Sequence, residues 1–196
     1  MSTPTASERP SLRVGKVPGV TVTKWRGIWA ERFPRVRLEA IDVDEQDQRR
    51  VLTDGQVEMC FVRLPIDDDG LHLIRLYDEL PVAWVSKDHV VAAADEVTLA
   101  DLANDTVLTS ATPHNIDLAA LGEAVLHVPQ SIARAESRRD LVYLPITDAP
   151  HTTVGIAWLK DNPNELVDEF IGIVRGRTAN SSRTAQARAS KGQTKG

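Results

Sequence analysis

The sequence predicts an α/β fold in which short buried strands alternate with helices. Apolar segments such as "LRVGKV" are followed by segments of helical spacing such as "TKWRGIWAERF" along most of the chain. The links between the first three strands are short, which favours parallel pairing with right-handed crossovers. With 196 residues, 42% of them apolar, the chain can bury the core of one domain or of two small lobes.

The first part of the chain is predicted to fold as β-α-β-α-β. Its three strands are expected at residues 12–17, 38–43 and 58–64. The first helix, residues 24–33, carries its large apolar side chains at helical spacing and ends before Pro34. The second is a polar helix from Glu45 to Thr53, which Gly55 closes.

The middle of the chain adds two strand candidates, "LHLIRLY" and "LPVAWVS", after an acidic turn. That turn, Asp67–Gly70, lacks the alternating ligands of a calcium-binding loop, so a solvated turn is predicted. Thr98 and Asp101 have the spacing of a capping box, which predicts a short helix through Ala103.

The last third is predicted to hold three helices and three strands. A helix before Gly122, a strand through Val128 and a helix from about Ser131 come first, and the strands "LVYLPI" and "TTVGIAWL" follow. In the final helix, Asn162 is the expected cap and Pro163 occupies the first position, ahead of a continuous apolar face.

Charge is distributed unevenly along the chain. From Arg175 to Gly196 there are six basic residues and no acid, so the net charge of -5 divides into +6 for this tail and -11 for the rest. Residues 1–11 and 176–196 hold few large apolar residues and are predicted to be disordered, which leaves 12–175 as the folded domain. We interpret the tail as a solubilising terminus rather than a nucleic-acid arm, because no aromatic residues or recognition helix accompany it.

Composition also bears on compartment and redox state. The sequence has neither an apolar run of about twenty residues nor an export leader, so we expect a cytoplasmic protein with no membrane partner. Its single cysteine, Cys60, lies in the apolar run "EMCFV" and is interpreted as a core residue rather than a reactive thiol.

Motifs that carry catalysis are absent from the sequence. There is no nucleophile elbow, no phosphate-binding loop and no dinucleotide-binding glycine pattern. The five histidines never occur at the i, i+4 spacing that places two metal ligands on one helix face. We therefore predict a protein that is not an enzyme and that has no cofactor and no metal.

The residues that follow the predicted strands are the remaining candidates for a binding site. Ligands of open α/β sheets bind beyond the carboxyl ends of parallel strands. Three strand ends each combine exposed backbone with a proline, and they supply the candidate ligand-binding residues Pro18, Gly19, Val20, Thr21, Arg63, Leu64, Pro65, Val128, Pro129 and Gln130. Arg63 is the candidate partner for a ligand carboxylate, and the alternative is a solvated surface arginine. At any single site, the alternative is that Pro and Gly merely form turns.

Several of these segments together resemble the effector-binding domain of LysR-type transcriptional regulators. The resemblance rests on "LRVGKVPGVTVTKW", on "ERFPRVRLEAIDVDEQDQRRVLTDGQVEMCFVRLP" and on "LHLIRLYDELPVAWVSKDHVVA" with "TLADLANDTVL". "LGEAVLHVPQSIA" is similar to the family's "G-x-G-I-x-x-L-P" strand and helix. The similarity covers about residues 12–175.

The resemblance implies a type II periplasmic-binding-protein-like fold of two α/β lobes joined by crossing strands. Lobe I would comprise about residues 12–80 and 153–175, and lobe II about 86–150. It also implies that a small effector binds between the lobes, where the turn Pro18–Thr21 would contribute backbone and hydroxyl groups. Because this turn precedes a helix N-terminus, we expect a small anionic metabolite.

The sequence departs from the family pattern at three places. Only eleven residues precede the first strand, so we expect no winged helix-turn-helix and no specific DNA binding by this chain alone. "LTSATPHNIDLAAL" leads to "LGEAVLHVP" without the usual intervening strand and helices, which predicts a shortened second lobe. Val90 stands after His89, where the family commonly has proline.

Two functions remain open from the sequence. The first is a non-catalytic, effector-binding protein linked to transcription regulation, and the second is an interaction protein on the same fold that has lost its ligand. The resemblance also implies a homodimer through the helix Lys24–Phe33, with one tryptophan partly in the interface. The alternative is that Trp25 and Trp29 both belong to the core.

Overall fold

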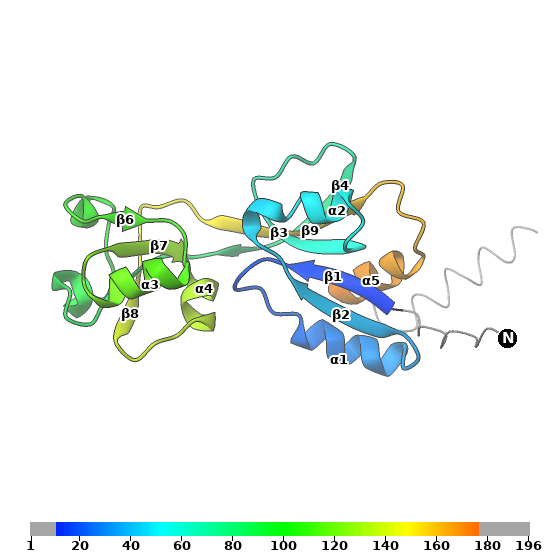
Figure 1. The fold of residues 1–196 in the computed structure, drawn as a ribbon, viewed down its shortest axis with the longest axis horizontal. Helices are drawn as coiled ribbons and strands as arrows, with labels where there is room; N and C mark the ends of the chain where they lie inside the picture. Colours follow the sequence, from blue (N-terminus) through cyan, green and yellow to red (C-terminus); the bar gives the residue numbers. More distant parts are fainter. Residues whose placement is uncertain (1–10, 177–196) are drawn as a thin grey trace, which may run out of the picture.

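The computed structural model describes residues 11–176 of the chain. They form two α/β lobes joined by two extended segments (Figure 1). Lobe I contains a five-stranded sheet in the order β2-β1-β3-β9-β4, and lobe II contains a four-stranded sheet in the order β6-β7-β5-β8. This is the predicted arrangement of two lobes with crossing strands. The predictions for residues 1–10 and 177–196 lie outside the described residues.

The sheet of lobe I is parallel on one side and antiparallel on the other. Its strands are β1 (Ser11–Lys16), β2 (Arg37–Asp42), β3 (Met59–Arg63), β4 (Leu71–Glu79) and β9 (Thr152–Leu159). β1 pairs in parallel with both β2 and β3, as the short crossovers predict. β9 pairs antiparallel with β3 and β4, because it returns to lobe I from lobe II.

Two helices cover one face of the lobe I sheet. They are α1 (Thr23–Arg32) and α5 (Leu166–Val174). Trp29 of α1 is 1% exposed, donates its Nε1–H to the Val36 carbonyl at 2.9 Å and lies edge-on to Phe170 of α5. Trp25 is half-buried and stacks on Phe61 of β3, with ring centroids 4.8 Å apart. Trp29 thus belongs to the core, and Trp25 packs on it.

The opposite face carries a short helix and a buried cysteine. The predicted helix from Glu45 to Thr53 is divided into a 3-10 turn, η1 (Glu45–Asp47), and one α-helical turn, α2 (Arg50–Thr53). Gln48 lies between them and turns its buried amide onto the backbone of β3, which accounts for the interruption. Cys60 is fully buried, as predicted, and burial raises the pKa of its thiol to about 12.

Lobe II is built on β5 (Pro81–Ser86), which continues the chain from β4 after Leu80. Its other strands are β6 (Val107–Leu108), β7 (Val125–Pro129) and β8 (Leu141–Pro145). The second sheet therefore begins before the predicted lobe boundary at residue 86. Helices α3 (Pro113–Ala120) and α4 (Gln130–Ala135) pack on one face, and the 3-10 turns η2 (Val90–Ala93) and η3 (Ala100–Leu102) flank the other.

Two local predictions were wrong. The strand thought missing from lobe II is present as β6, which has only two residues and pairs in parallel with β7. The final helix begins at Leu166 rather than Pro163, because the Asn162 side chain donates to the Glu58 carbonyl and Asn164 accepts from the Leu166 N–H. The capping box at Thr98 is present, although it starts a 3-10 turn.

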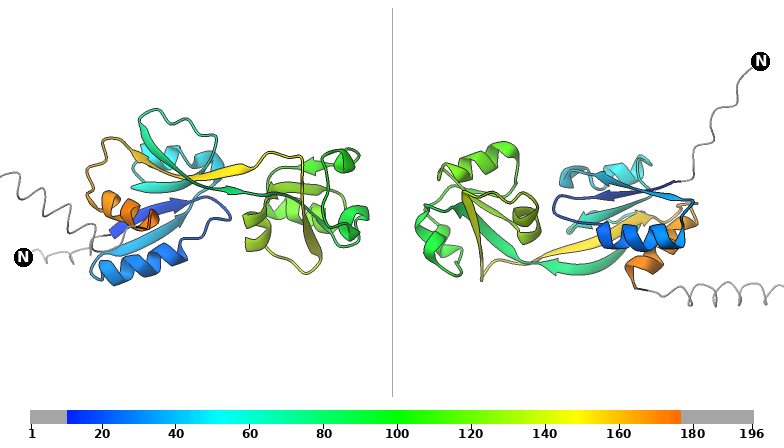
Figure 2. Two further views of the ribbon diagram at one scale, coloured as in Figure 1. Left: turned by 180° about the vertical axis from the view of Figure 1, so that it is seen from behind. Right: turned by 90° about the horizontal axis from the view of Figure 1, so that it is seen from below.

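The views from behind and below show that the two crossing segments lie on one side of the molecule (Figure 2). On the other side, the loop after β1 extends from lobe I toward α4 of lobe II. Within residues 11–176, no helix is long and apolar enough to cross a membrane.

Candidate functional site

A groove of about 1320 Å³ lies between the two lobes. Lobe I contributes the loop after β1, the end of β2 and the η1–α2 segment. Lobe II contributes the loop between β6 and α3 and one side of α4. The predicted residues Pro18, Gly19, Val20 and Thr21 all line this groove.

The loop after β1 is held against lobe II by a glycine. Gly19 has φ +84°, a conformation that side chains rarely adopt, and a Cβ there would lie 2.5 Å from Ser131 Oγ and 2.9 Å from the Ile132 nitrogen. Val20 is buried beside it, whereas Thr21 is exposed toward the groove. Glycine is therefore required here both by the turn and by the close approach of α4.

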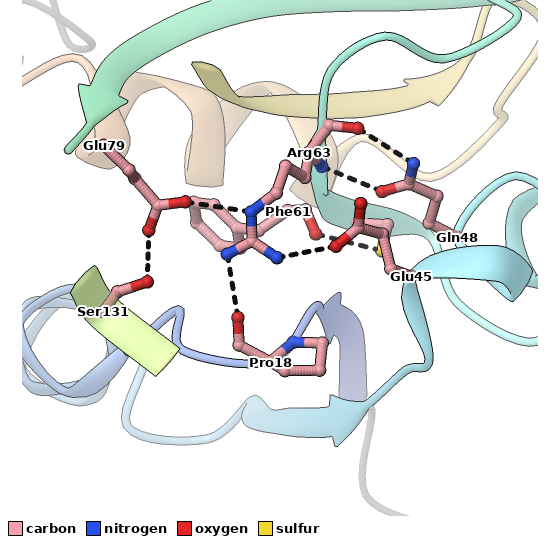
Figure 3. A network of polar contacts seen from close by, with 8 residues as sticks. Pro18, Glu45, Gln48, Phe61, Arg63, Glu79 and Ser131 are labelled. Atoms are coloured by element: carbon pink, nitrogen blue, oxygen red, sulfur yellow. Dashed lines mark hydrogen bonds and ion pairs between the residues drawn. The ribbon is translucent and has the colours of Figure 1, made fainter. Parts of the chain in front are cut away.

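Arg63 lies behind this loop and is 2% exposed (Figure 3). Its Nε donates to Glu79 Oε2 at 2.9 Å, its Nη1 to Glu45 Oε2 at 2.8 Å, and its Nη2 to the Pro18 carbonyl at 2.9 Å. Burial lowers the pKa of Arg63, but hydrogen bonds and charge from the two glutamates outweigh this effect and raise the pKa overall. The guanidinium is thus a buried, charged hub, which excludes the alternative of a solvated surface arginine.

Glu79 connects this hub to lobe II. Its side chain is 4% exposed, and it ends β4 at the point where the chain crosses between lobes. One carboxylate oxygen accepts from Arg63, and the other accepts from the hydroxyl of Ser131 on α4 (Figure 3). The Ser131–Glu79–Arg63 chain therefore links the helix of one lobe to the strand of the other.

Gln48 fixes the backbone that carries the arginine. Its Nε2 donates to the Arg63 carbonyl at 2.9 Å, and its Oε1 accepts from the Arg63 N–H at 2.8 Å. Because both backbone groups of one residue are satisfied by a single side chain, the end of β3 is held at a defined distance from η1. The same contact places Glu45, three residues earlier, against the guanidinium.

The other predicted residues lie outside the lining of the groove. Leu64 donates its N–H to the Thr153 carbonyl of β9, and Pro65 follows it in the chain. Val128 and Pro129 pair with β5, and Gln130 donates its N–H to the Leu80 carbonyl at the crossing point. Val128, Pro129 and Gln130 thus hold the strand end at the crossing point, while Ile132, Ala135 and Glu136 of α4 and the residue after it reach the groove.

Sequence reasoning missed the wall that lobe II contributes, residues 109–113. Thr109, Ser110 and Thr112 line the groove, and the Thr112 hydroxyl also caps α3 by accepting from the Asn115 N–H. Asn115 in turn holds Ser110 through its carbonyl and hydroxyl oxygens. These residues follow β6, so they too are a strand end. A strand of two residues is too short to produce a recognisable alternation of apolar and polar residues, so the sequence did not reveal this strand end.

The side chains that line the groove carry an excess of negative charge. Five are carboxylates, namely Asp42, Asp44, Glu45, Asp47 and Glu136, and two are basic, namely Lys16 and Arg50. Lys16 pairs with Asp42, and Arg50 pairs with Asp47 at 3.0 Å. Among these lining residues both cations therefore already have a carboxylate partner. In residues 11–176 no group of three or more His, Cys, Asp or Glu side chains could hold a metal ion.

A family model described as the LysR substrate binding domain matches residues 6–116, which is more than half of the chain. The chain belongs to the LysR substrate-binding domain family. A relative of this LysR-type domain is the HTH-type transcriptional regulator AlsR of Bacillus subtilis (strain 168), which is 22% identical. That match covers 74% of this chain and 58% of AlsR, so the chain spans little more than half of its curated relative.

Solved structures show the same fold as this LysR-type domain. The effector-binding domain of BenM with its effector benzoate superimposes with a TM-score of 0.70 at 21% identity, covering 97% of both chains. The reduced OxyR regulatory domain from Pseudomonas aeruginosa gives 0.69 at 18% identity, covering 85% of this chain and 95% of its own. The prediction of a type II periplasmic-binding-protein-like, effector-domain fold is therefore confirmed.

Proposed function

We propose that this LysR-type domain binds a small-molecule effector in the groove between its lobes and takes part in transcription regulation. The observation that carries the proposal is that both lobes line one groove of about 1320 Å³, so that a bound molecule would contact both. The BenM domain, which has the same fold, binds benzoate, and AlsR is a transcriptional regulator. We propose no catalytic step, because the lining shows no nucleophile with a base beside it.

The charge of the groove lining differs from what the expected anionic effector would require. The sequence favours a small anionic metabolite at Pro18–Thr21, where the N-terminus of α1 begins. The carboxylates that line the lobe I wall repel an anion, and their two basic neighbours are already paired. An effector would therefore direct any anionic group toward α1 and any cationic or neutral group toward η1.

One observation favours the second candidate function, an interaction protein without a ligand. Every side-chain nitrogen of Arg63 already donates to an acceptor of this chain, so the predicted carboxylate partner is occupied. Lobe II is also small, with a two-residue edge strand and a six-residue α4. If no ligand binds, we assign the fold to protein contacts alone.

We also propose a homodimer through α1 and the residue that follows it, as the family resemblance implies. Trp29 is committed to the core, which leaves half-buried Trp25 as the only tryptophan of α1 that could reach an interface. The exposed face of α1 offers Arg26, Gly27 and Ala30. Gly27 and Ala30 add little side-chain bulk to this face, so a partner could approach the helix closely. Specific DNA binding by this chain alone forms no part of the proposal.

A thermal-shift screen tests effector binding. Small carboxylates, amines and neutral aromatic compounds are added to the full chain, because a ligand that binds only the native state raises the unfolding midpoint. At about 100 times its Kd, a ligand adds about 2.7 kcal/mol, which corresponds to roughly 5 to 10 °C for a protein of this size.

The Gly19→Val variant provides the control, because its side chain would collide with Ser131 and with the Ile132 backbone and so disturb the lobe contact that shapes the groove. A compound that stabilises both proteins equally binds elsewhere. If no compound raises the midpoint of the natural chain, effector binding is rejected in favour of the interaction protein.

A further inference from the structure

We propose that Glu45 is a built-in carboxylate that occupies Arg63 and thereby selects against effectors that place a carboxylate at this position. The inference rests on the proposed function, since it concerns the ligand preference of the same groove. In this proposal Arg63 does not receive the anionic group of a ligand, because a carboxylate of the chain itself already neutralises its charge.

The three acceptors around Arg63 differ in how far a ligand could reach them. Glu79 is 4% exposed and is held from its other side by Ser131, and the Pro18 carbonyl belongs to the loop that packs on α4. Glu45 is 51% exposed, lies on the 3-10 turn η1 and lines the groove. Of the three, Glu45 is therefore the acceptor that an incoming molecule could replace (Figure 3).

The charges of the network show why Glu45 acts as a substitute ligand. Glu79 alone neutralises Arg63, so Glu45 brings one excess negative charge to the same guanidinium. A ligand carboxylate at this point would add a second excess charge or would have to displace Glu45. Because Glu45 is tethered to the chain, its effective concentration at Arg63 is high, and displacement is unfavourable.

The surroundings do not relieve this repulsion. Asp44 and Asp47 flank Glu45 and line the same wall, and the basic side chains Lys16 and Arg50 are paired with Asp42 and Asp47. Without the charge of Glu45, the Nη1 of Arg63 would lose its carboxylate partner, because Glu79 contacts the Nε instead. The structure thus assigns the blocking of Arg63 itself to a single side chain, Glu45, within a wall that is acidic overall.

The test compares benzoate binding by the natural chain, by Glu45→Gln and by a matched control. Benzoate is chosen because it is a compact carboxylate that binds a domain of the same fold. Asp44→Asn is the control, since it removes the same charge from the adjacent position of the groove without touching Arg63. We expect isothermal titration to show at least tenfold tighter benzoate binding for Glu45→Gln, and less than a threefold gain for Asp44→Asn.

A second measurement locates the effect. In Glu45→Gln the NMR signal of the Arg63 Nε–H group should shift on adding benzoate, and in the natural chain it should not. Equal gains in the two variants would mean that only the general field of the groove matters, and no gain in Glu45→Gln would mean that Glu45 does not guard Arg63. Either result overturns the inference.

The outcomes also separate this inference from the proposed function. If the screen finds an effector for the natural chain and Glu45→Gln gains no benzoate affinity, the function stands and the inference fails. If the screen finds none and Glu45→Gln gains benzoate binding at Arg63, the inference stands and the natural chain is not an effector sensor.

Discussion

Arg63 shows how much a single residue can and cannot reveal from sequence. Its place at the end of a buried strand was predictable, but the carboxylate that the sequence predicted as its partner was that of a ligand. That its partners are Glu79 and Glu45 was not predictable, because Glu79 lies on the crossing strand and Glu45 is positioned through Gln48. Which carboxylate reaches a cation depends on tertiary packing, and no spacing rule in the sequence describes it.

Replacing Glu79 by Gln should destabilise the protein strongly. The substitution leaves the buried Arg63 with a half-exposed carboxylate as its charged partner, so the cost should lie near the lower end of that for breaking a buried pair, about 3 kcal/mol. Urea denaturation followed by tryptophan fluorescence measures it. Glu45→Gln removes the charge of an exposed partner of the same arginine but keeps an acceptor oxygen, so it should cost less than about 1 kcal/mol. Equal losses in the two variants would contradict the division of the network into a buried and an exposed arm.

At the scale of elements, the periodicity of the sequence predicted most strands and the main helices. It failed where a side chain bonds to distant backbone instead of continuing a helix, as Gln48 does before α2 and Asn162 does before α5. It also failed for β6, which exists only because β7 offers it a partner. Helix α1 was located correctly, but its two tryptophans differ in burial in a way that spacing alone does not specify.

Helix α1 provides the prediction for assembly. Ala30 is exposed on this helix, on the face away from the core, whereas Trp29 beside it is buried. Ala30→Arg should leave the fold intact but place a bulky charge in the proposed interface, so that light scattering changes from twice the 21.5 kDa chain mass to the monomer. His114→Arg on α3 of lobe II, also exposed, is the control for added charge. A natural chain that is monomeric at high micromolar concentration would refute the dimer.

The two lobes are joined by two crossing segments and by one latch, which is the contact of Ser131 on α4 with Glu79 and with the Gly19 loop of lobe I. The crossing segments were predictable from the family resemblance, and pairs such as Glu79 with Thr152 hold their strands together. The latch was not predictable, because it requires Gly19 of one lobe and Ser131 of the other to meet. A groove lined from both lobes exists only while the lobes hold this arrangement. Ligand affinity should therefore depend on contacts that the ligand never touches.

The hydroxyl of Ser131 tests this dependence. It donates to Glu79 across the lobe boundary but is not among the residues that line the groove. Ser131→Ala removes one hydrogen bond from the closed arrangement of the lobes. It should destabilise that arrangement relative to the open one by about 0.5 to 1.5 kcal/mol. Where open molecules already predominate, apparent affinity for an effector found in the screen should fall roughly 2- to 12-fold, because only closed molecules bind it fully. Ser137→Ala, an exposed serine two residues after α4, should leave the affinity unchanged in the same titration. If Ser131→Ala also binds as tightly as the natural chain, the latch does not control the groove, and the lobes are held together by the packing of Gly19 on α4 alone.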